Sequence, residues 1–159
     1  ITNKLNNILF VEQENKQLGF VGTPKEINQL IIEQIVKEKK VPVIAPLGLD
    51  KNNQVFNINA DTAAGAIAKK LNARRLIIMS DVEGVLDDKK KLVSEINTDK
   101  VNDLINNDII SGGMIPKIKN CLDVASNGVK GVCIIDGRLD HSILFELLSN
   151  AGSGTLIRE

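Results

Sequence analysis

The sequence predicts an α/β fold, in which a mainly parallel sheet is sandwiched between helices in three layers, with β-hairpins at the edge of the sheet. Short apolar runs, typical of buried strands, alternate along the chain with segments of helical periodicity. Apolar residues make up 43% of the chain and charged residues 25%, the composition of a globular domain. Because 159 residues suffice for one hydrophobic core, we expect a single domain over residues 1–159.

The chain opens with a predicted hairpin and helix. Residues 8–11 and 18–21 are apolar runs on either side of a polar stretch, the pattern of two paired strands. A helix is predicted over residues 23–39, because the Thr-Pro-Lys-Glu sequence at its start has the features of a capping box and its isoleucines and leucine fall on one face.

Two short strands and a helix lead to the middle of the chain. Residues 41–45 and 55–58 are predicted as strands, joined by a turn-rich connection over residues 47–54. A helix of small residues is predicted over residues 62–71, followed by a buried strand over residues 76–79.

The second half continues the same alternation. The lysine-rich residues 87–91 predict a solvated turn, although a lysine run can also bind phosphate. The last predicted helix is expected to turn Ile143, Leu144 and Leu147 inward. The elements predicted after the turn are helices over residues 99–105, 115–127 and 142–148 and strands over residues 132–135 and 154–157.

The composition argues against several classes of function. Twenty basic and twenty acidic residues give no net charge, and aromatic residues are only 3%, so neither nucleic acid nor membrane is expected as a partner. No signal peptide or membrane-spanning run is visible, and the start at Ile1 suggests that something upstream was removed or left out. Cys121 and Cys133 are expected to be reduced, packed thiols, which fits the cytoplasm or a plastid stroma.

Three polar residues mark one candidate site at the start of a helix. Asn57 and Asn59 alternate along a strand, so both amides should point into the same space and offer fixed donors and acceptors. Asp61 stands where the helix begins. It could simply cap that helix, but its place beside two asparagines favours a functional site.

A second candidate site combines glycines and a lysine. Gly112, Gly113 and Met114 precede Lys117 at the start of a helix, where backbone amides favour anions and an ammonium adds a point charge. The alternative is an ordinary surface lysine. The polar loop over residues 80–86 follows a buried strand, where α/β proteins bind ligands, although a simple turn would look the same.

Five motifs occur in a fixed order, at residues 57–64, 80–86, 111–117, 135–138 and 152–155. Their sequences, order and spacing resemble the acetylglutamate kinases of the amino acid kinase family. The resemblance extends from about Leu18 onward. It implies that the chain matches the carboxyl-terminal, nucleotide-binding part of such an enzyme, and that the amino-terminal acetylglutamate-binding lobe is absent.

The resemblance also implies a reaction and a set of roles. The reaction transfers phosphate from ATP, with Mg²⁺ held by the nucleotide, to N-acetyl-L-glutamate in arginine biosynthesis. In the family, the residues matching Asn57 and Asn59 hold acetylglutamate, the match to Asp61 orients the catalytic lysines, and the match to Lys117 stabilises the phosphoryl group in flight. The implied nucleotide-binding residues are Ser80, Asp81, Gly84, Val85, Leu86, Gly112, Gly113 and Met114.

Regulation and assembly are implied in the same way. Glu146 and Gly152 match positions that line the arginine site of feedback-inhibited members, although Cys133 stands where a histidine is expected in those members. The resemblance further implies a homo-oligomer for a full-length form. It allows the PII signal protein as a partner if the source is photosynthetic.

Two other readings of the function stay open. The chain could belong to a sister kinase acting on glutamate, aspartate, carbamate or UMP, or it could be a non-catalytic nucleotide-binding or regulatory module. The glycine-rich phosphate loops and a second catalytic lysine of the family belong to the absent lobe. We therefore expect the chain alone to bind nucleotide weakly and to turn over little or not at all.

Overall fold

The computed structural model describes residues 7–107, 109–110, 112–149 and 152–159. The chain divides into two compact units, residues 1–71 and 72–159, and each is described here by itself. None of the described helices is both long enough and apolar enough to cross a bilayer.

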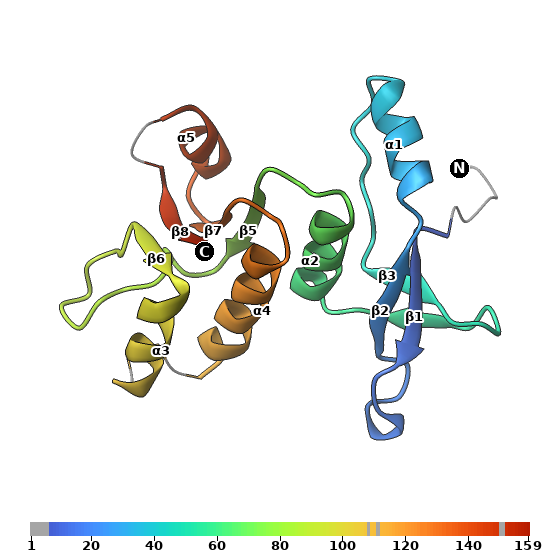
Figure 1. Ribbon diagram of the computed structural model, residues 1–159, viewed down its shortest axis with the longest axis horizontal. Coiled ribbons are helices and arrows are strands. Elements are labelled where there is room, and N and C mark those ends of the chain that lie inside the picture. Colours follow the sequence, from blue (N-terminus) through green and yellow to red (C-terminus); the bar gives the residue numbers. More distant parts are fainter. Residues whose placement is uncertain (1–6, 108, 111, 150–151) are drawn as a thin grey trace. The chain divides into compact units, whose positions relative to one another are not determined.

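Unit 1 is built on a four-stranded sheet with the strand order β2-β1-β3-β4. Strand β1 pairs with β2 in an antiparallel ladder, in blue in Figure 1, and with β3 in parallel, while β3 and β4 are antiparallel. The elements of this unit are β1 (Leu9–Gln13), the 3₁₀ helix η1 (Lys16–Leu18), β2 (Gly22–Ile27), α1 (Gln29–Lys37), β3 (Leu47–Leu49), β4 (Val55–Asn57) and α2 (Ala60–Lys70).

The core of unit 1 joins this sheet to both helices. Helix α2 packs against β2, and its buried side is made of small residues, which allow a close approach to the sheet. Because α2 and β4 share this core, it fixes where the polar turn between them lies. The buried cluster consists of Leu9, Val11, Ile27, Ile32, Phe56, Ile58 and Ala63.

Unit 2 has a second four-stranded sheet, with the order β5-β7-β8-β6. Strands β5 and β7 are parallel, β7 and β8 antiparallel, and β8 and β6 parallel. Helix α4 packs on β7 and β8, and α5 packs on β7 (Figure 1). The elements are β5 (Leu76–Ser80), β6 (Glu95–Asn97), α3 (Thr98–Asn106), α4 (Met114–Ser126), β7 (Val132–Asp136), α5 (Ser142–Leu148) and β8 (Gly154–Arg158).

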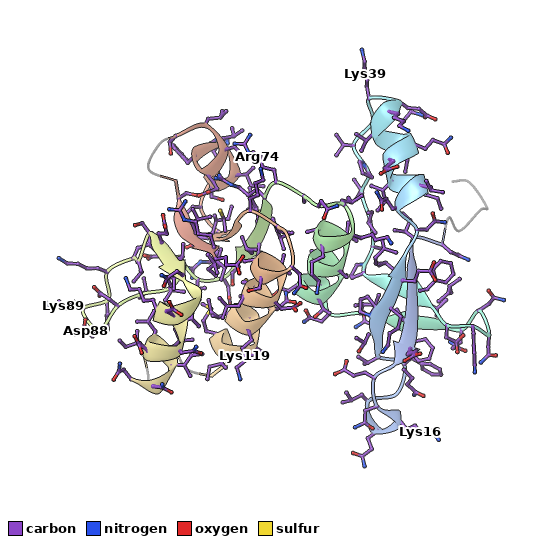
Figure 2. The ribbon with its side chains drawn as sticks, in the orientation of Figure 1. Lys16, Lys39, Arg74, Asp88, Lys89 and Lys119 are labelled. Carbon is purple, nitrogen blue, oxygen red and sulfur yellow. The ribbon has the colours of Figure 1, made fainter. Side chains whose placement is uncertain are left out.

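The predicted α/β class is confirmed, and the elements of unit 2 lie close to their predicted bounds. Strand β7 is buried along its whole length, which explains why its sequence is a continuous apolar run. The lysine-rich turn is also confirmed, because Asp88 and Lys89 lie exposed at the tip of the loop between β5 and β6 (Figure 2). In both sheets, however, parallel and antiparallel pairs are mixed.

The prediction for residues 23–39 is wrong at its start. Residues 23–27 belong to strand β2, and α1 begins only at Gln29. Thr23 pairs with Glu12, and Pro24 stands opposite Val11 where the register of the ladder shifts. Since β2 is an edge strand with an irregular register, it tolerates a proline, and the pairing with β1 overrides the local helix signal.

Four further local predictions are wrong. The predicted strand over residues 18–21 begins in η1, and β2 starts only at Gly22, while the predicted turn-rich connection over residues 47–54 opens with strand β3. Residues 41–45 lie outside every strand, although they were expected to form one. On α5, Ile143, Leu144 and Leu147 are exposed, whereas Ser142 and Glu146 are buried. The helix therefore turns a polar side towards its sheet, where Glu146 accepts hydrogen bonds from Arg75, Cys133 and Ser153.

Candidate functional site

The Asn57–Asp61 group of unit 1 spans the turn from β4 into α2. Strand β4 ends at Asn57, whose backbone N–H donates to the carbonyl of Phe20 at 2.8 Å. Asn57 and Asn59 are exposed on either side of the buried Ile58, which confirms the predicted alternation. Both side chains therefore lie at the surface, on either side of a core residue.

Asn59 rather than Asp61 caps the helix. The Asn59 Oδ1 accepts hydrogen bonds from the backbone N–H of Thr62 at 3.1 Å and from the Thr62 hydroxyl at 3.3 Å. Asp61 lies inside the first turn of α2 and is half-buried. Asp61 therefore does not cap α2, because Asn59 does. Asp61 lies in the first turn, where the helix dipole favours a carboxylate.

In unit 2, the residues predicted to bind nucleotide after β5 divide into an outer and an inner group. Asp81 is exposed and Ser80 half-buried, with the Ser80 hydroxyl 3.3 Å from the Asp81 carboxylate. Gly84 and Val85 are buried. Gly84 has φ +143°, and a Cβ there would lie 2.6 Å from the Thr155 hydroxyl. The loop is therefore anchored by its second half, which leaves its first half at the surface.

Thr155 is the anchor of this loop. It is fully buried, and its hydroxyl accepts from the Val85 N–H at 2.8 Å and donates to the Val93 carbonyl at 2.7 Å. We expect Thr155→Val to lower the free energy of unfolding by about 1–3 kcal/mol, because the buried Val85 N–H and the half-buried Val93 carbonyl lose their partner. Urea unfolding checks this. Thr155→Ser keeps the hydroxyl and should lose less, and equal losses for both variants would contradict the explanation.

The start of α4 carries the second predicted group. Gly113 is the N-cap residue and makes no side-chain cap, and the first turn of α4 contains no acidic residue. Gly112 has φ +56°, and a Cβ at Gly112 or Gly113 would meet no atom within 4 Å. Lys117 is half-buried and is the fourth residue of the helix. Ser111, which belongs to the same motif, lies outside the described residues.

This arrangement suits an anion. Backbone N–H groups at an uncapped helix start carry a partial positive charge, and two glycines leave the backbone open to close approach. Lys117 adds a full positive charge one turn along. Met114 is half-buried at the first position of the helix and supplies an apolar neighbour. The two glycines therefore leave open space beside the start of α4.

An ion pair at the end of β7, between a buried carboxylate and an exposed arginine, was missed as a candidate. Asp136 is 3% exposed and accepts from the Arg138 backbone N–H at 2.9 Å, from Nε at 2.9 Å and from Nη2 at 2.7 Å. Ser80 and Asp136 are partners in the parallel β5–β7 ladder, so both strands end at the same edge. The signal was present in the sequence, because Asp136 directly follows a buried apolar run.

Arg138 also links this edge to the loop after β5. Its hydrogen bonds lower the pKa of Asp136 to about 2, and Asp136 in turn raises the pKa of Arg138. The carboxylates of Asp81 and Glu83 raise the Arg138 pKa further. The edge therefore combines one guanidinium with several carboxylates, the outer ones at the surface.

The Asp136–Arg138 pair predicts a pH dependence of stability. The Asp136 pKa is depressed in the folded chain from its ordinary value of 3.8, so the stabilisation is complete above pH 3.8 and is lost as the pH falls towards about 2. We expect the stability difference between wild type and Asp136→Asn to shrink across this window in acid unfolding. Asp88→Asn removes an exposed carboxylate and serves as the control. A difference independent of pH would contradict the prediction.

Glu146 and Gly152 meet at a polar cavity of unit 2. The buried Glu146 carboxylate receives the Arg75 Nη1 at 3.2 Å, the Cys133 thiol at 3.0 Å and the Ser153 N–H at 3.0 Å. These contacts explain why α5 turns a polar side inward. Gly152 has φ +69°, and a Cβ there would lie 2.9 Å from Glu146 Oε2.

The cavity beside this cluster has a volume of about 240 Å³. Glu95 and Glu146 both line it, together with Arg75 and Gly152, so a ligand there would meet two carboxylates and one guanidinium. Burial, and then the hydrogen bond to Glu146, raise the pKa of the Cys133 thiol to about 12. Cys121 and Cys133 are buried thiols outside any disulfide, as predicted.

The structure thus assigns the predicted residues to three places. Asn57, Asn59 and Asp61 lie together in unit 1. In unit 2, the loop after β5 shares an edge with the end of β7, and Gly112 to Lys117 form the start of α4. Leu86 is half-buried and bridges to Leu92 in an antiparallel pair.

Comparisons with known proteins find close relatives of the whole chain. It is 71% identical over all 159 residues to the acetylglutamate kinase of Pelagibacter ubique, and it spans 55% of that enzyme's length. The solved structure of the smu.665 protein of Streptococcus mutans is 33% identical, with a TM-score of 0.79, over 95% of this chain and 56% of that one.

A more distant structure shares the fold. The N-acetylglutamate synthase of Neisseria gonorrhoeae, complexed with coenzyme A and N-acetyl-glutamate, aligns over 97% of this chain and 37% of its own with a TM-score of 0.88 at 20% identity. The sequence model of the amino acid kinase family matches residues 4–136. Since this match takes in most of the chain and all of the residues that bear the first three motifs, the chain belongs to the amino acid kinase family.

Proposed function

We propose that this chain is the carboxyl-terminal, nucleotide-binding part of an acetylglutamate kinase. The reaction would be ATP plus N-acetyl-L-glutamate giving N-acetyl-L-glutamyl 5-phosphate and ADP, a step of arginine biosynthesis. The observation that carries the proposal is the 71% identity to such an enzyme over the entire chain. The rest of the acceptor pocket would come from the part of the relatives' length that the chain does not span.

The start of α4 would bind the phosphates of ATP. Gly112 and Gly113 leave their backbone open, and the positive end of the α4 dipole favours negative charge, although Ile115 N–H already donates to the Gly112 carbonyl at 3.3 Å and Pro116 has no N–H. Lys117 would then stabilise charge on the transferred phosphoryl group, because positioning and electrostatics dominate such reactions. Mg²⁺, carried by the nucleotide, would supply further neutralisation of the phosphate charge.

The remainder of the nucleotide site would come from the loop after β5. Ser80 and Asp81 are at its outer end and could reach a ligand directly. Gly84 and Val85 are buried against Thr155, so their contribution would be to hold the loop in shape. Leu86 and Met114, both half-buried, would offer apolar contacts to a base.

The acceptor would be held by Asn57 and Asn59. Their exposed amides can hydrogen-bond the carboxylate and acetamido groups of acetylglutamate. The acceptor carboxylate is already ionised at neutral pH, so no general base is required. The main obstacle is repulsion between two anions, which the lysines would reduce. Asp61 would orient the catalytic lysines, as in the family.

The test uses a chimera in which these 159 residues replace the matching segment of the Pelagibacter ubique enzyme. A coupled assay of ADP formation would compare N-acetyl-L-glutamate with glutamate, aspartate, carbamate and UMP. We expect turnover with N-acetyl-L-glutamate alone, and little or none from the 159-residue chain by itself. A folded chimera that prefers another acceptor, or that binds ATP without turnover, would refute the proposed activity.

We further propose the cavity at Glu146 and Gly152 as the site of an arginine effector. Two carboxylates line it, which suits a guanidinium or an amine. Arg75 already contacts Glu146 and Arg158 contacts Glu95, so an effector would have to share or displace one of these pairs. Arginine should inhibit the chimera, and Glu146→Gln should relieve the inhibition. Inhibition that is unchanged in Glu146→Gln would place the effector elsewhere.

Assembly and cellular context are proposed from the family alone. The full-length enzyme would be a cytoplasmic or plastid homo-oligomer, with PII as a partner in a photosynthetic source. Light scattering of the chimera, with and without PII, would test both statements. A monomer at micromolar concentration would argue against the oligomer.

A further inference from the structure

Arg138 lies just beyond the carboxyl end of β7, beside the loop that follows β5. The two strands are parallel neighbours, and their last residues, Ser80 and Asp136, pair with each other. The contact continues for one more step, because the Gly137 N–H donates to the Ser80 carbonyl at 2.7 Å. Asp81 and Arg138 therefore each follow directly on a residue of this last backbone contact.

Gly137 allows the two chain segments to approach closely at this point. A Cβ at Gly137 would lie 3.3 Å from the Ser80 carbonyl oxygen and 3.4 Å from the Met79 Cβ. A residue without a side chain suits such an approach. The turn after β7 therefore runs in contact with the end of β5, and Arg138 starts from that contact.

The Arg138 side chain is fixed on one side and open on the other. Its Nε and Nη2 donate to the two carboxylate oxygens of Asp136, a two-pronged contact that sets the plane of the guanidinium. The Asp136 carboxylate is buried, whereas 62% of the Arg138 side chain is exposed. Among the described residues, no hydrogen bond engages the Arg138 Nη1. The guanidinium thus has a fixed direction and an open edge.

The loop after β5 brings carboxylates towards this guanidinium. Asp136, through its hydrogen bonds, is the main cause of the raised pKa of Arg138. The charges of Asp81 and then of Glu83 raise this pKa further. The Asp81 carboxylate also accepts from the Ser80 hydroxyl at 3.3 Å. Asp81 is therefore attracted from two sides, by the hydroxyl before it in the chain and by a guanidinium whose direction is fixed.

We propose that Arg138 is a positioning residue of the nucleotide site, and that it holds the Asp81 carboxylate where it can meet the nucleotide. Thr155 anchors the inner half of the loop, whereas Asp81 in the outer half is exposed. Arg138 would anchor this outer half, because the buried Asp136 fixes the guanidinium and the guanidinium attracts Asp81. The proposal rests on the proposed function in taking this loop as part of the nucleotide site.

A double-mutant cycle between Arg138 and Asp81 tests the proposal. NMR titration with the magnesium complex of a non-hydrolysable ATP analogue would measure Kd for the 159-residue chain and its variants. We expect Arg138→Gln to raise Kd about tenfold in the native chain, but less than about twofold in a chain that carries Asp81→Asn. Glu83→Gln is the matched background. There, Arg138→Gln should again raise Kd about tenfold, because Glu83 is not the group that Arg138 positions.

Two further variants separate positioning from a general loss of charge or stability. Arg74→Gln removes an exposed guanidinium that lies before β5 rather than after it, labelled in Figure 2, and should leave Kd within about twofold of wild type. Arg138→Lys keeps the charge but loses the two-pronged contact, so its Kd should lie between those of wild type and Arg138→Gln. If Arg138→Gln does not fold, the same cycle with Arg138→Lys decides the question.

The outcomes distinguish this inference from the proposed function. A similar loss of affinity with and without Asp81→Asn would mean that Arg138 binds the nucleotide itself or supports the fold in general, and would overturn the inference. An unchanged Kd for Arg138→Gln would overturn it as well, and in both cases wild type still binds nucleotide. No binding by wild type would remove the nucleotide site and both proposals with it. A chimera that phosphorylates another acceptor would leave the inference standing, because its readout is nucleotide binding.

Discussion

Replacing Lys117 with alanine is expected to lower kcat of the chimeric kinase by about 10²–10³-fold, with a smaller change in KM for acetylglutamate. The side chain is half-buried on the first turn of α4, next to the open glycines where we propose that the phosphates bind. An interaction that strengthens with charge in the transition state is lost mainly from kcat.

Lys119→Ala is the matched control. Lys119 lies on the same helix two residues further on, is exposed, and is labelled in Figure 2. Steady-state assays of the two variants should separate a specific role from a general loss of charge. Equal effects of both substitutions, or an active Lys117→Ala enzyme, would remove Lys117 from the reaction.

Gly154→Ala is expected to lower the free energy of unfolding by about 3 kcal/mol, at the upper end of what overpacking costs. Gly154 is paired with Ile135 at the start of β8. A Cβ there would overlap the carbonyl oxygen of Ile134 and lie 3.0 Å from the Ile135 Cα. These are backbone atoms of a fully buried strand, which cannot move aside without disrupting the sheet.

Gly113→Ala provides the control for stability. An added Cβ at Gly113 meets no atom within 4 Å, so its effect on unfolding should be within about 0.5 kcal/mol. Urea unfolding of the two variants, monitored by far-ultraviolet circular dichroism, measures the difference. A Gly154→Ala chain as stable as wild type would contradict the packing of β8 against β7.

Local sequence signals were sufficient to predict an element where that element's tertiary contacts favour the same structure. The run that became β7 could be predicted because a strand buried on both faces needs apolar residues at every position. The end of α4 could be predicted as well, since Gly128 adopts φ +97° just past the helix. The exposed alternation of Asn57 and Asn59 followed from the period of a strand.

Where the prediction failed, the deciding contact lies far away in the sequence. Nothing near residue 24 indicates that Pro24 will stand opposite Val11 in a ladder. Likewise, α5 turns Glu146 inward because its carboxylate accepts hydrogen bonds from Arg75 and Cys133. Arg75 lies 71 residues earlier in the sequence and Cys133 lies 13 residues earlier. The α5 sequence alone favours its aliphatic side.

In the candidate site, too, some features follow from the local sequence and others depend on distant contacts. The motifs were sufficient to predict the residue types of the site. They could not predict that Gly84 and Val85 are buried against Thr155, because Thr155 belongs to a strand 70 residues after Val85. The Asp136–Arg138 pair could have been found from its position after a buried strand.

The most direct test of the nucleotide site is a calorimetric titration of the 159-residue chain with the magnesium complex of a non-hydrolysable ATP analogue. The wild-type chain, Lys117→Ala and Lys119→Ala would be titrated under the same conditions. The account predicts weak but measurable binding by wild type and Lys119→Ala, and at least tenfold weaker binding by Lys117→Ala. Binding that is unaffected by Lys117→Ala, or no binding by a folded wild-type chain, would contradict it.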